Sequence, residues 1–382
     1  MGQFMVLKKI KLSNFRNYSN LEIEFSPNVN IIYGNNAQGK TNLLESIYVL
    51  GLTRSHRLYT NNNILKDGES ICKIKGFLVK NKIKTSMEII LEAQKKTLKI
   101  DDKEIKKVSD YIYEGFDTII FYPEDLEIIK GSPSSRRNFI NLEHSQISNN
   151  YLQLLTDYNK LLKIRNDYLK KMAKGIETDE NYFDIITNYL IDKAILITKM
   201  REKLISEIND ACGEIFKNIT KNPDFYLKYT KSILGDNIAS DDELKQELIN
   251  KFKKTLKKEI RFGATLIGPH RDDIEFFLGD KNLKEYGSQG QQRVAILSIK
   301  LSEIAIFEKY KRTKPILLLD DVFSELDNIK RNNLVKYINN NIQVIITTTD
   351  LKKINKDLLN KSKTFKIKEG TIIKLEEVEK NE

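Results

Sequence analysis

Eight residues near the start of the chain match the phosphate-binding pattern G-x-x-x-x-G-K-[ST] at every constrained position. They are Gly34, Asn35, Asn36, Ala37, Gln38, Gly39, Lys40 and Thr41, called the phosphate loop below. Its glycines let the backbone curl so that amides point at a phosphate, and the dipole of a following helix adds positive potential. Lys40 would reach the β- and γ-phosphates, and the Thr41 hydroxyl would bind Mg²⁺. The alternative is a glycine-containing turn that only caps a helix.

A second stretch, Leu317-Leu318-Leu319-Asp320-Asp321, supplies what a phosphate loop requires from another strand of its sheet. Asp320 would hold the Mg²⁺ shell through water, and Asp321 would point at the attacking water as the candidate general base. Lys40 and Asp321 are therefore the residues expected to carry catalysis. An acidic pair in this place can also be a helix cap or part of a turn.

A third stretch, Ser288-Gln289-Gly290-Gln291-Gln292, stands at the start of a predicted helix. Its serine hydroxyl and exposed backbone amides could grip another phosphate. The simpler interpretation is that Ser288 is a helix N-cap followed by a flexible glycine, and both roles can coexist. The order of the motifs favours a functional role, since the phosphate loop, this stretch, the acidic strand and Ser324-Glu325-Leu326-Asp327 follow one another along the chain.

The segments around these motifs predict an α/β fold. Val29–Tyr33 is an apolar run typical of a buried strand, and residues 41–50 continue after the loop with the pattern of a helix. Strand, loop and helix in this order are the context that a phosphate loop needs. Short strand-like runs over residues 71–79, 85–92 and 97–100 predict an antiparallel sheet beside this core.

From about Ser134 the pattern changes to apolar residues at helical spacing, with lysines and acids between them, as in Leu152, Leu155, Tyr158 and Leu162. We therefore predict a helical arm over residues 125–245. The arm would be inserted into a head formed by residues 1–124 and 246–382.

The formal charge of +11 over 382 residues points to an anionic partner, because clustered Lys and Arg gain affinity for a phosphate backbone by releasing counterions. A Lys-rich composition that is spread along the chain also fits a merely solvated surface. Candidate contacts to DNA are Arg54, Arg57, Arg136, Arg137, Lys160, Lys163, Lys170 and Lys171, and Arg54 and Arg57 could instead reach a nucleotide.

Only two cysteines occur, Cys72 and Cys212, and they are far apart in the sequence. They indicate a reducing compartment and argue against a zinc or disulfide scaffold. No apolar stretch approaches the length needed to span a bilayer. We expect a cytoplasmic protein with no membrane partner.

Taken together, these motifs resemble the ABC-type P-loop ATPase heads of the SMC and Rad50 kind. Residues 34–41 are similar to a Walker A motif, residues 288–292 to an ABC signature, residues 317–321 to a Walker B motif and residues 324–327 to a D-loop. Within that group the chain resembles the RecF family of recombination and gap-repair proteins. The supporting stretches are residues 12–18, 33–42, 122–126, 130–133, 136–137, 268–273 and 320–327.

The resemblance implies an ATP-dependent homodimer with shared sites. Lys40 and Thr41 of one subunit would hold ATP and Mg²⁺, while Ser288 and Gly290 of the other subunit close over the γ-phosphate. It also implies nucleotide contacts from Gln289, Gln291 and Asp327. ATP would bridge the two subunits, and its hydrolysis would loosen the clamp.

The same resemblance implies slow, DNA-stimulated ATP hydrolysis that times how long the clamp stays on DNA. Asp321 stands where most ABC proteins carry the longer Glu, which agrees with slow turnover. The implied partners are double-stranded DNA next to single-stranded gaps, single/double-strand junctions, RecR and RecO. The implied role is recombinational repair and replication restart, by helping to load RecA.

Other functions remain open for a chain with these motifs. A transporter-type ABC subunit would need a membrane partner, and an SMC or Rad50 head could be used structurally. An ABC-like ATPase associated with a nuclease is a further alternative. Two details are also open: His270 could be a catalytic base or a structural histidine, and Thr348 or Thr349 could contact the γ-phosphate.

Overall fold

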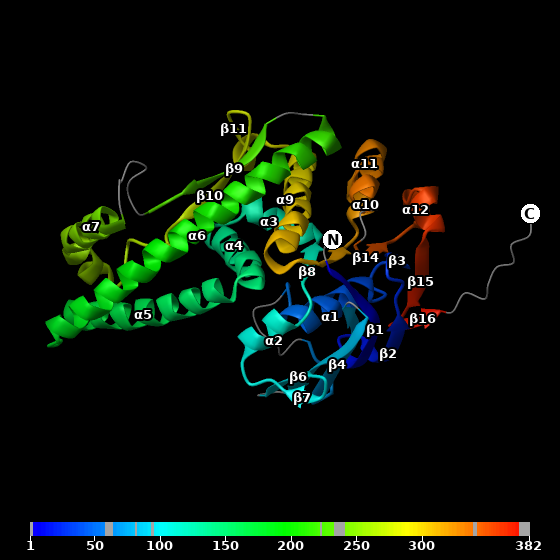
Figure 1. Ribbon diagram of the computed structural model, residues 1–382, viewed down its shortest axis with the longest axis horizontal. Coiled ribbons are helices and arrows are strands. Elements are labelled where there is room, and N and C mark those ends of the chain that lie inside the picture. The colour runs from blue at the N-terminus through cyan, green and yellow to red at the C-terminus, as the bar shows by residue number, and fades with distance from the viewer. Residues whose placement is uncertain are drawn as a thin grey trace, which may run out of the picture. The chain divides into compact units, whose positions relative to one another are not determined.

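The computed structural model describes residues 3–57, 64–80, 82–92, 95–221, 224–232, 241–338 and 342–373, and every structural statement below refers to these residues. The chain divides into two compact units (Figure 1). Unit 1 comprises Met1–Leu126, Ala211–Pro223 and Ser288–Glu382. Unit 2 comprises Glu127–Asp210 and Asp224–Gly287.

The core of unit 1 is a six-stranded sheet in the order β16-β15-β3-β14-β13-β8. Its strands are β3 (Val29–Tyr33), β8 (Thr118–Phe121), β13 (Ile316–Leu319), β14 (Val344–Thr348), β15 (Ser362–Lys368) and β16 (Thr371–Ile373). All neighbours are parallel except β15 and β16. Every residue of β8, β13 and β14 is buried, as expected for parallel strands that are covered on both faces.

The parallel register of the strands places the motif residues at one edge of the sheet. Leu319 of β13 lies opposite Ile346 of β14, and Thr348 of β14 lies opposite Tyr33 of β3. The carboxyl ends of these three strands therefore meet at one edge of the sheet. The phosphate loop follows β3 there, and Asp320 and Asp321 follow β13.

Helices of unit 1 follow or precede these strands. The ones nearest the motifs are α1 (Lys40–Leu52), α9 (Gln289–Lys311), α10 (Val322–Glu325) and α11 (Asn328–Ile338). The others are α2 (Val108–Glu114), η2 (Pro123–Asp125), η3 (Leu351–Lys353) and α12 (Lys356–Asn360). All residues of α1 are buried except Thr41 and Asn42, which lie in its first turn.

A second, seven-stranded sheet in unit 1 confirms the expected antiparallel layer. It contains β1 (Gln3–Phe15), β2 (Tyr18–Glu24), β4 (Ile71–Lys80), β5 (Ile83–Glu92), β6 (Lys96–Ile100), β7 (Lys103–Glu104) and β12 (Thr313–Lys314). Neighbouring strands are antiparallel except for β1 and β12. The predicted α/β head, with a mixed sheet and an antiparallel sheet, is thus confirmed.

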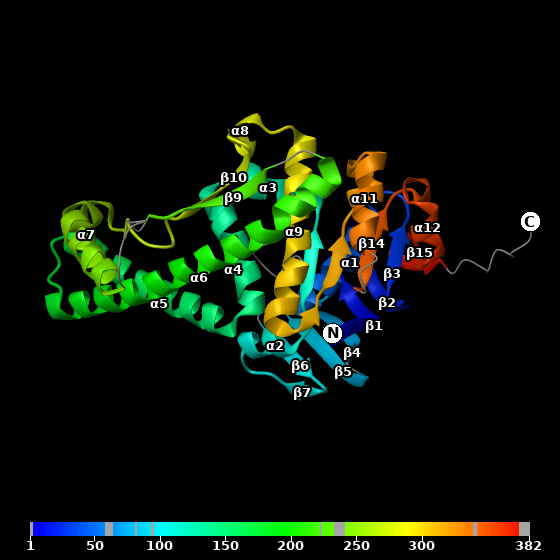
Figure 2. The same ribbon diagram turned by 45° about the horizontal axis from the view of Figure 1, so that its top comes forward.

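Unit 2 is mainly helical. It contains α4 (Pro133–Ile147), α5 (Asn149–Ala173), α7 (Asp241–Phe262), α8 (Leu283–Tyr286), most of α3 (Leu126–Lys130) and residues 180–210 of α6 (Glu180–Thr220). A three-stranded sheet joins them, formed by β9 (Phe225–Thr230), β10 (Asp273–Leu278) and β11 (Lys281–Asn282). Figures 1 and 2 show α5 and α6 side by side, with α7 against one end of the pair.

This unit differs from the predicted arm over residues 125–245 at its far boundary. It continues to Gly287, because Leu248 and Phe252 of α7 pack into the α5–α6 core and β10 pairs with β9. Residues 211–223 belong instead to unit 1. The strands β9 and β10 pair although they are far apart in the sequence, and the spacing of apolar residues within a short stretch does not predict such a pairing.

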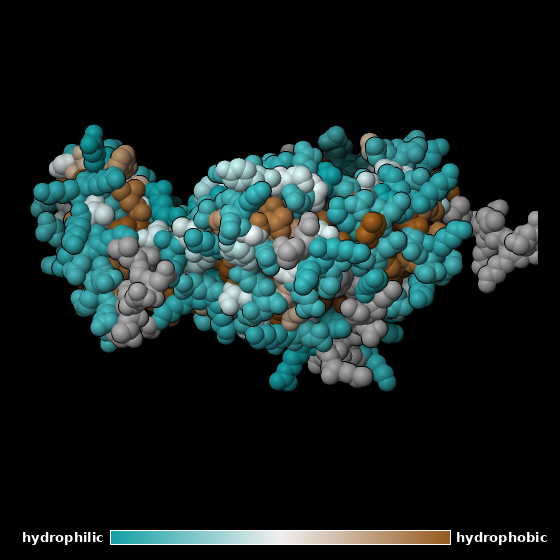
Figure 3. All heavy atoms as spheres, turned by 90° about the horizontal axis from the view of Figure 1, so that it is seen from above, coloured by the Kyte–Doolittle hydropathy of each residue, from teal (hydrophilic) through white to brown (hydrophobic). Residues whose placement is uncertain are grey.

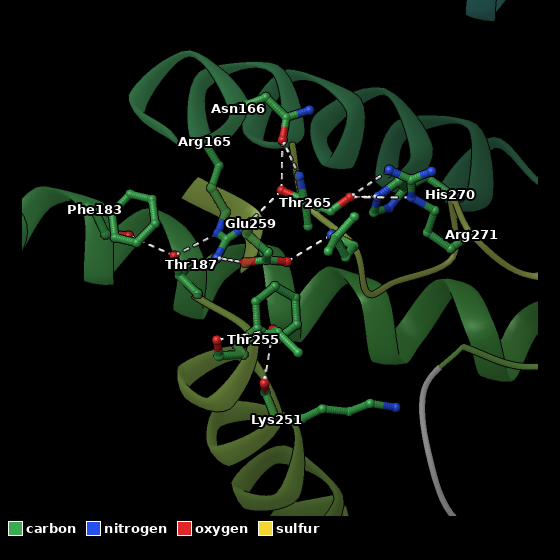
Figure 4. Close-up of polar contacts among 12 residues, drawn as sticks. Arg165, Asn166, Phe183, Thr187, Lys251, Thr255, Glu259, Thr265, His270 and Arg271 are labelled. Carbon is green, nitrogen blue, oxygen red and sulfur yellow. Dashed lines mark hydrogen bonds and ion pairs between the residues drawn. The ribbon is translucent and has the colours of Figure 1, made fainter. Parts of the chain in front are cut away.

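A buried ion pair joins helices of unit 2 (Figure 4). Arg165 of α5 donates from Nη2 to Oε2 of Glu259 in α7 at 2.7 Å, and both side chains are at most 1% exposed. Arg165 also donates to the Thr187 hydroxyl at 3.0 Å and to the Thr265 hydroxyl at 2.8 Å. The second Glu259 oxygen accepts from the Leu266 amide at 2.8 Å, so this pair joins three helices to the segment after α7.

In the described residues, no helix is both long and apolar enough to cross a membrane. Hydrophilic residues cover most of the face seen in Figure 3.

Candidate nucleotide-binding site

The phosphate loop follows a path that only glycine permits at two positions. Gly34 has φ 154° and Gly39 has φ 110°. A Cβ added at Gly34 would lie 2.3 Å from the Ile367 carbonyl oxygen, and one at Gly39 would lie 2.6 Å from Asn17 Nδ2 and 2.9 Å from the Tyr18 hydroxyl. Both glycines of the motif are therefore required by close neighbours inside the chain.

Those neighbours also hold the loop by hydrogen bonds. The Tyr18 hydroxyl donates to the Gly39 carbonyl at 2.9 Å, and Asn17 Nδ2 donates to the Gln38 carbonyl at 3.2 Å. From the turn between β15 and β16, the Gly370 amide donates to the same carbonyl at 3.1 Å, and the Glu369 amide donates to Gln38 Oε1 at 2.8 Å. Two turns far apart in sequence thus fix the outer side of the loop.

The Lys40 ammonium lies over the loop. Its Nζ donates to the carbonyls of Gly34 at 2.8 Å and Asn35 at 2.7 Å. Burial lowers its pKa, and the nearby carboxylates of Asp321 and Asp320 oppose that effect. An ammonium carries three N–H donors, so a phosphate oxygen can take the one that these two carbonyls do not use.

Asp320 is 4% exposed and accepts hydrogen bonds from two hydroxyls. Thr41 Oγ1 donates to its Oδ1 at 3.0 Å, and Thr347 Oγ1 donates to the same oxygen at 2.6 Å. Burial raises the pKa of Asp320, while the bonds from Thr347 and Thr41 oppose the rise. Hydroxyl and carboxylate oxygens this close suit Mg²⁺, which prefers hard oxygen ligands.

Asp321 begins α10 in a left-handed conformation with φ 51°. Its amide donates to Thr347 Oγ1 at 2.9 Å, and Ser324 Oγ donates to its Oδ1 at 2.6 Å. Lys353 Nζ donates in turn to Ser324 Oγ at 3.2 Å. The carboxylate is thus oriented by a hydroxyl that is itself held in place.

A cavity of ≈ 290 Å³ unites these groups. The predicted residues in its wall are Asn36, Ala37, Gly39, Lys40, Thr41, Asp320 and Asp321, and Asn42, Arg57, Thr347 and Thr349 complete it. Arg57 Nη1 donates to Asn42 Oδ1 at 3.1 Å, so its guanidinium reaches the cavity rim. Of the two threonines predicted near the γ-phosphate, Thr349 lines the cavity, whereas the Thr348 hydroxyl bonds the backbone of Asp350.

Other predicted residues lie outside the wall of this cavity. Gly34, Asn35 and Gln38 shape the loop from behind through the contacts given above. Ser288, Gln289, Gly290 and Gln291 form the first turn of α9, where Ser288 Oγ accepts from the Gln291 amide at 3.3 Å and Gln291 Oε1 accepts from the Ser288 amide at 2.9 Å. The predicted helix cap is thus present.

Asp327 also caps a helix and does not line the cavity. Its Oδ1 accepts from the Lys330 amide at 2.9 Å, and its Oδ2 lies 2.6 Å from Lys330 Nζ. The hydrogen bonds from Lys330 lower its pKa. Within one chain, therefore, Asp327 and residues 288–291 do not line this cavity.

The structure adds a buried ion pair that the sequence analysis missed. Arg16 donates from Nε to Glu45 Oε2 at 3.0 Å and from Nη2 to Oε1 at 2.7 Å, and Ser55 Oγ donates to Oε1 at 2.5 Å. Burial alone would raise the pKa of Glu45, but the bonds from Arg16 and Ser55 leave it below its ordinary value. The pair ties the turn that carries Asn17 and Tyr18 to α1.

Two residues of unit 2 that were candidates for functional roles have structural partners instead. His270 holds the Tyr158 hydroxyl with Nδ1 at 2.6 Å and the Thr265 carbonyl with Nε2 at 3.0 Å, and burial lowers its pKa to about 4. It is a structural histidine. Arg136, predicted to contact DNA, is 4% exposed and binds both oxygens of Asp273, at 2.6 and 2.8 Å.

The chain matches the family described as "RecF/RecN/SMC N terminal domain" over residues 6–372. It is 41% identical over 369 residues to the DNA replication and repair protein RecF of Ligilactobacillus salivarius, covering 96% of this chain and 97% of the relative. A solved structure described as the recombination mediator protein RecF with ATP in the RecFOR pathway aligns with a TM-score of 0.90 and 32% identity, over 98% of this chain and 99% of that one.

A more distant structure, the Smc head domain of Pyrococcus furiosus with an extended coiled coil, aligns with a TM-score of 0.53 and 14% identity over 96% of this chain and 95% of that one. This likeness concerns the fold alone. The match to relatives over nearly the whole chain agrees with the fold of unit 1 and with its phosphate loop. The chain belongs to the RecF family of DNA replication and repair proteins.

Proposed function

We propose that this chain binds ATP with Mg²⁺ in the cavity of unit 1 and hydrolyses ATP slowly, as the timer of a DNA clamp in recombinational repair. The observation that carries the proposal is the convergence of the phosphate loop, Asp320 and Asp321 on one cavity. The 32% identical structure described as RecF with ATP supports the choice of nucleotide.

In this proposal the loop amides and Lys40 bind the phosphates, and Thr41 and Asp320 hold Mg²⁺. The ion would neutralise charge on the phosphate oxygens. Asp321, oriented by Ser324, accepts the proton of the attacking water. Because an aspartate reaches less far than a glutamate, we expect slow turnover.

Gly290 supports a role for the signature stretch, residues 288–292, outside its own chain. A Cβ added at Gly290 would meet no atom within 4 Å among the described residues. Glycine is a weaker helix former than alanine, and no close contact within its own chain among the described residues requires it at this position. We propose that the γ-phosphate of a partner's ATP approaches here, where the Ser288 O–H is available to donate because its oxygen serves as the cap acceptor.

The experiment that tests the proposed function is molar mass by light scattering, with ATP, with ADP and without nucleotide. ATP alone is expected to double the mass. Ser288→Arg is expected to prevent this, because a bulky cation at the first turn of α9 blocks the approach of a second subunit. If the molar mass does not change with ATP, the proposed role of Ser288 at a partner's nucleotide fails, and only its role as a helix cap remains.

DNA binding is supported by the outer face of α7. Five exposed cations stand in i, i+4 rows there: Lys253, Lys254, Lys257, Lys258 and Arg261. In the described part of the chain none of them forms an ion pair. Like charges at this spacing cost about 0.2–0.5 kcal/mol per pair, and the helix dipole offsets that cost only in the last turn. An anionic partner with regularly spaced phosphates would compensate for it.

Lys254→Glu with Lys258→Glu is therefore expected to weaken duplex DNA binding about tenfold at low salt and to lower the salt slope by about 2, because two phosphate contacts are lost. Fluorescence anisotropy across a salt series measures both. The exposed pair Lys73→Glu with Lys84→Glu, on the antiparallel sheet of unit 1, is the matched control and should change neither. An unchanged slope for the α7 variant would contradict this assignment.

The same proposal includes action with RecR and RecO at single/double-strand junctions, helping RecA to load. The support is the full-length similarity to RecF relatives and to a structure described as part of the RecFOR pathway.

A further inference from the structure

An ion pair connects the signature stretch with the segment that begins at Asp321. Arg293 follows the stretch by one residue on α9, and its Nη2 lies 3.0 Å from Oε1 of Glu325, the last residue of α10. The two side chains are 26% and 15% exposed. The two residues are 32 positions apart in the sequence, and both of their helices carry or adjoin motif residues.

The pair is incompletely satisfied. Arg293 Nε and Glu325 Oε2 are both shielded from solvent, and neither has a hydrogen-bond partner among the described residues. An arginine and a carboxylate can pair through two parallel bonds, which would use these two atoms. Buried polar atoms without partners are rare and costly in native proteins, and a two-bond arrangement of this pair would satisfy both atoms.

Glu325 also interacts electrostatically with the carboxylates of Asp321 and Asp320. Burial raises its pKa, Arg293 opposes the rise, and the charges of Asp321, Glu124 and Asp320 add to it. Ser324, the neighbour of Glu325, donates its hydroxyl to Asp321 Oδ1 at 2.6 Å. A shift of Asp321 on binding ATP would therefore displace the short α10 and with it the acidic partner of Arg293.

We propose that Arg293 and Glu325 form a positioning contact that couples the position of Asp321 to the presentation of Ser288 toward a second subunit. This rests on the proposed function, since it assigns Ser288 to the partner's nucleotide. Neither residue lines the cavity, so their action is on dimerisation and turnover and not on the binding of ATP by one chain. In this proposal Arg293 and Glu325 change between one hydrogen bond and two when ATP enters the cavity.

The test reverses the charges singly and together. Arg293→Glu and Glu325→Arg are each expected to weaken ATP-induced dimerisation and lower kcat about tenfold, whereas the affinity of one chain for ATP changes by less than about twofold. The double reversal is expected to restore both quantities to within about threefold of the wild type. Lys75→Asp with Asp102→Lys reverses a surface pair at 2.8 Å in the antiparallel sheet and serves as the control that should change nothing.

The measurements are light scattering over a concentration series, steady-state ATP turnover, a fluorescent-ATP titration and thermal unfolding. Single reversals that leave dimerisation and kcat unchanged would overturn the inference, as would a double reversal no better than the worse single variant. Loss of ATP affinity together with a lowered unfolding temperature would assign the pair a purely structural role and overturn it as well. A wild-type chain that does not dimerise with ATP would contradict the proposed function itself.

Discussion

Lys40→Ala is expected to weaken ATP binding about 10²–10³-fold while the fold stays intact, because an ammonium bonded to phosphate oxygens is a strong, charge-assisted contact in a partly buried site. The Lys40 ammonium bonds the carbonyls of Gly34 and Asn35, so the polar contacts that the substitution removes lie within the loop itself. Alanine is also a better helix former than lysine at the start of α1. A fluorescent-ATP titration measures the affinity, and thermal unfolding checks the fold.

The matched control is Lys96→Ala. Lys96 is also a partly buried lysine of unit 1, its Nζ donates to the Thr53 carbonyl at 2.9 Å, and burial lowers its pKa, as it does for Lys40. It does not line the cavity. ATP affinity should be unchanged in this variant. If Lys40→Ala retains the wild-type affinity, the assignment of residues 34–41 as a phosphate loop fails.

Glu259→Ala is expected to lower the free energy of unfolding of unit 2 by about 3–5 kcal/mol, because it leaves the Arg165 guanidinium buried without a counter-charge. The Leu266 amide loses its acceptor at the same time. Urea denaturation measures the loss, and hydrogen exchange should show that α5 and α7 lose protection. ATP binding should persist, since the cavity lies in unit 1.

Two comparisons separate the charge effect from simple truncation. Replacing both partners, Arg165→Met with Glu259→Leu, should recover most of the lost stability, because apolar side chains of similar size remove the uncompensated charge. Asp157→Ala breaks the exposed pair with Lys193, at 3.1 Å, and should cost about 0–1 kcal/mol. A cost below about 1 kcal/mol for Glu259→Ala would mean that water or another group already compensates Arg165.

The residues that line the cavity from the phosphate loop and the acidic pair could be predicted because they stand in short motifs at fixed spacing. The phosphate loop that carries Lys40 and Thr41 follows one strand directly, and Asp320 follows another, so the parallel register brings them together. Ser288 was predicted either as a cap or as a phosphate contact. The cap is confirmed, and the phosphate contact remains a proposal because it concerns a second subunit.

The residues that support the site could not be predicted in this way. Thr347 bonds Asp320, and Arg16 bonds Glu45, through contacts that only the folded sheets create. Arg136 became a candidate DNA contact because of its charge alone. The sequence does not reveal that it pairs with Asp273, 137 positions away. The part of unit 2 that lies beyond residue 245 was not predicted for the same reason, since the pairing of β9 with β10 spans α7.

The position of β3 has a consequence for the synthesis of the chain. The strand that leads into the phosphate loop lies between β14 and β15, which are residues 344–348 and 362–368. While the ribosome makes everything before them, this apolar strand has neither of its neighbours, and such unpaired strands aggregate readily. Gly34 also lacks the backbone of Ile367 against which its loop closes. The loop therefore reaches its folded shape only after translation has passed residue 368.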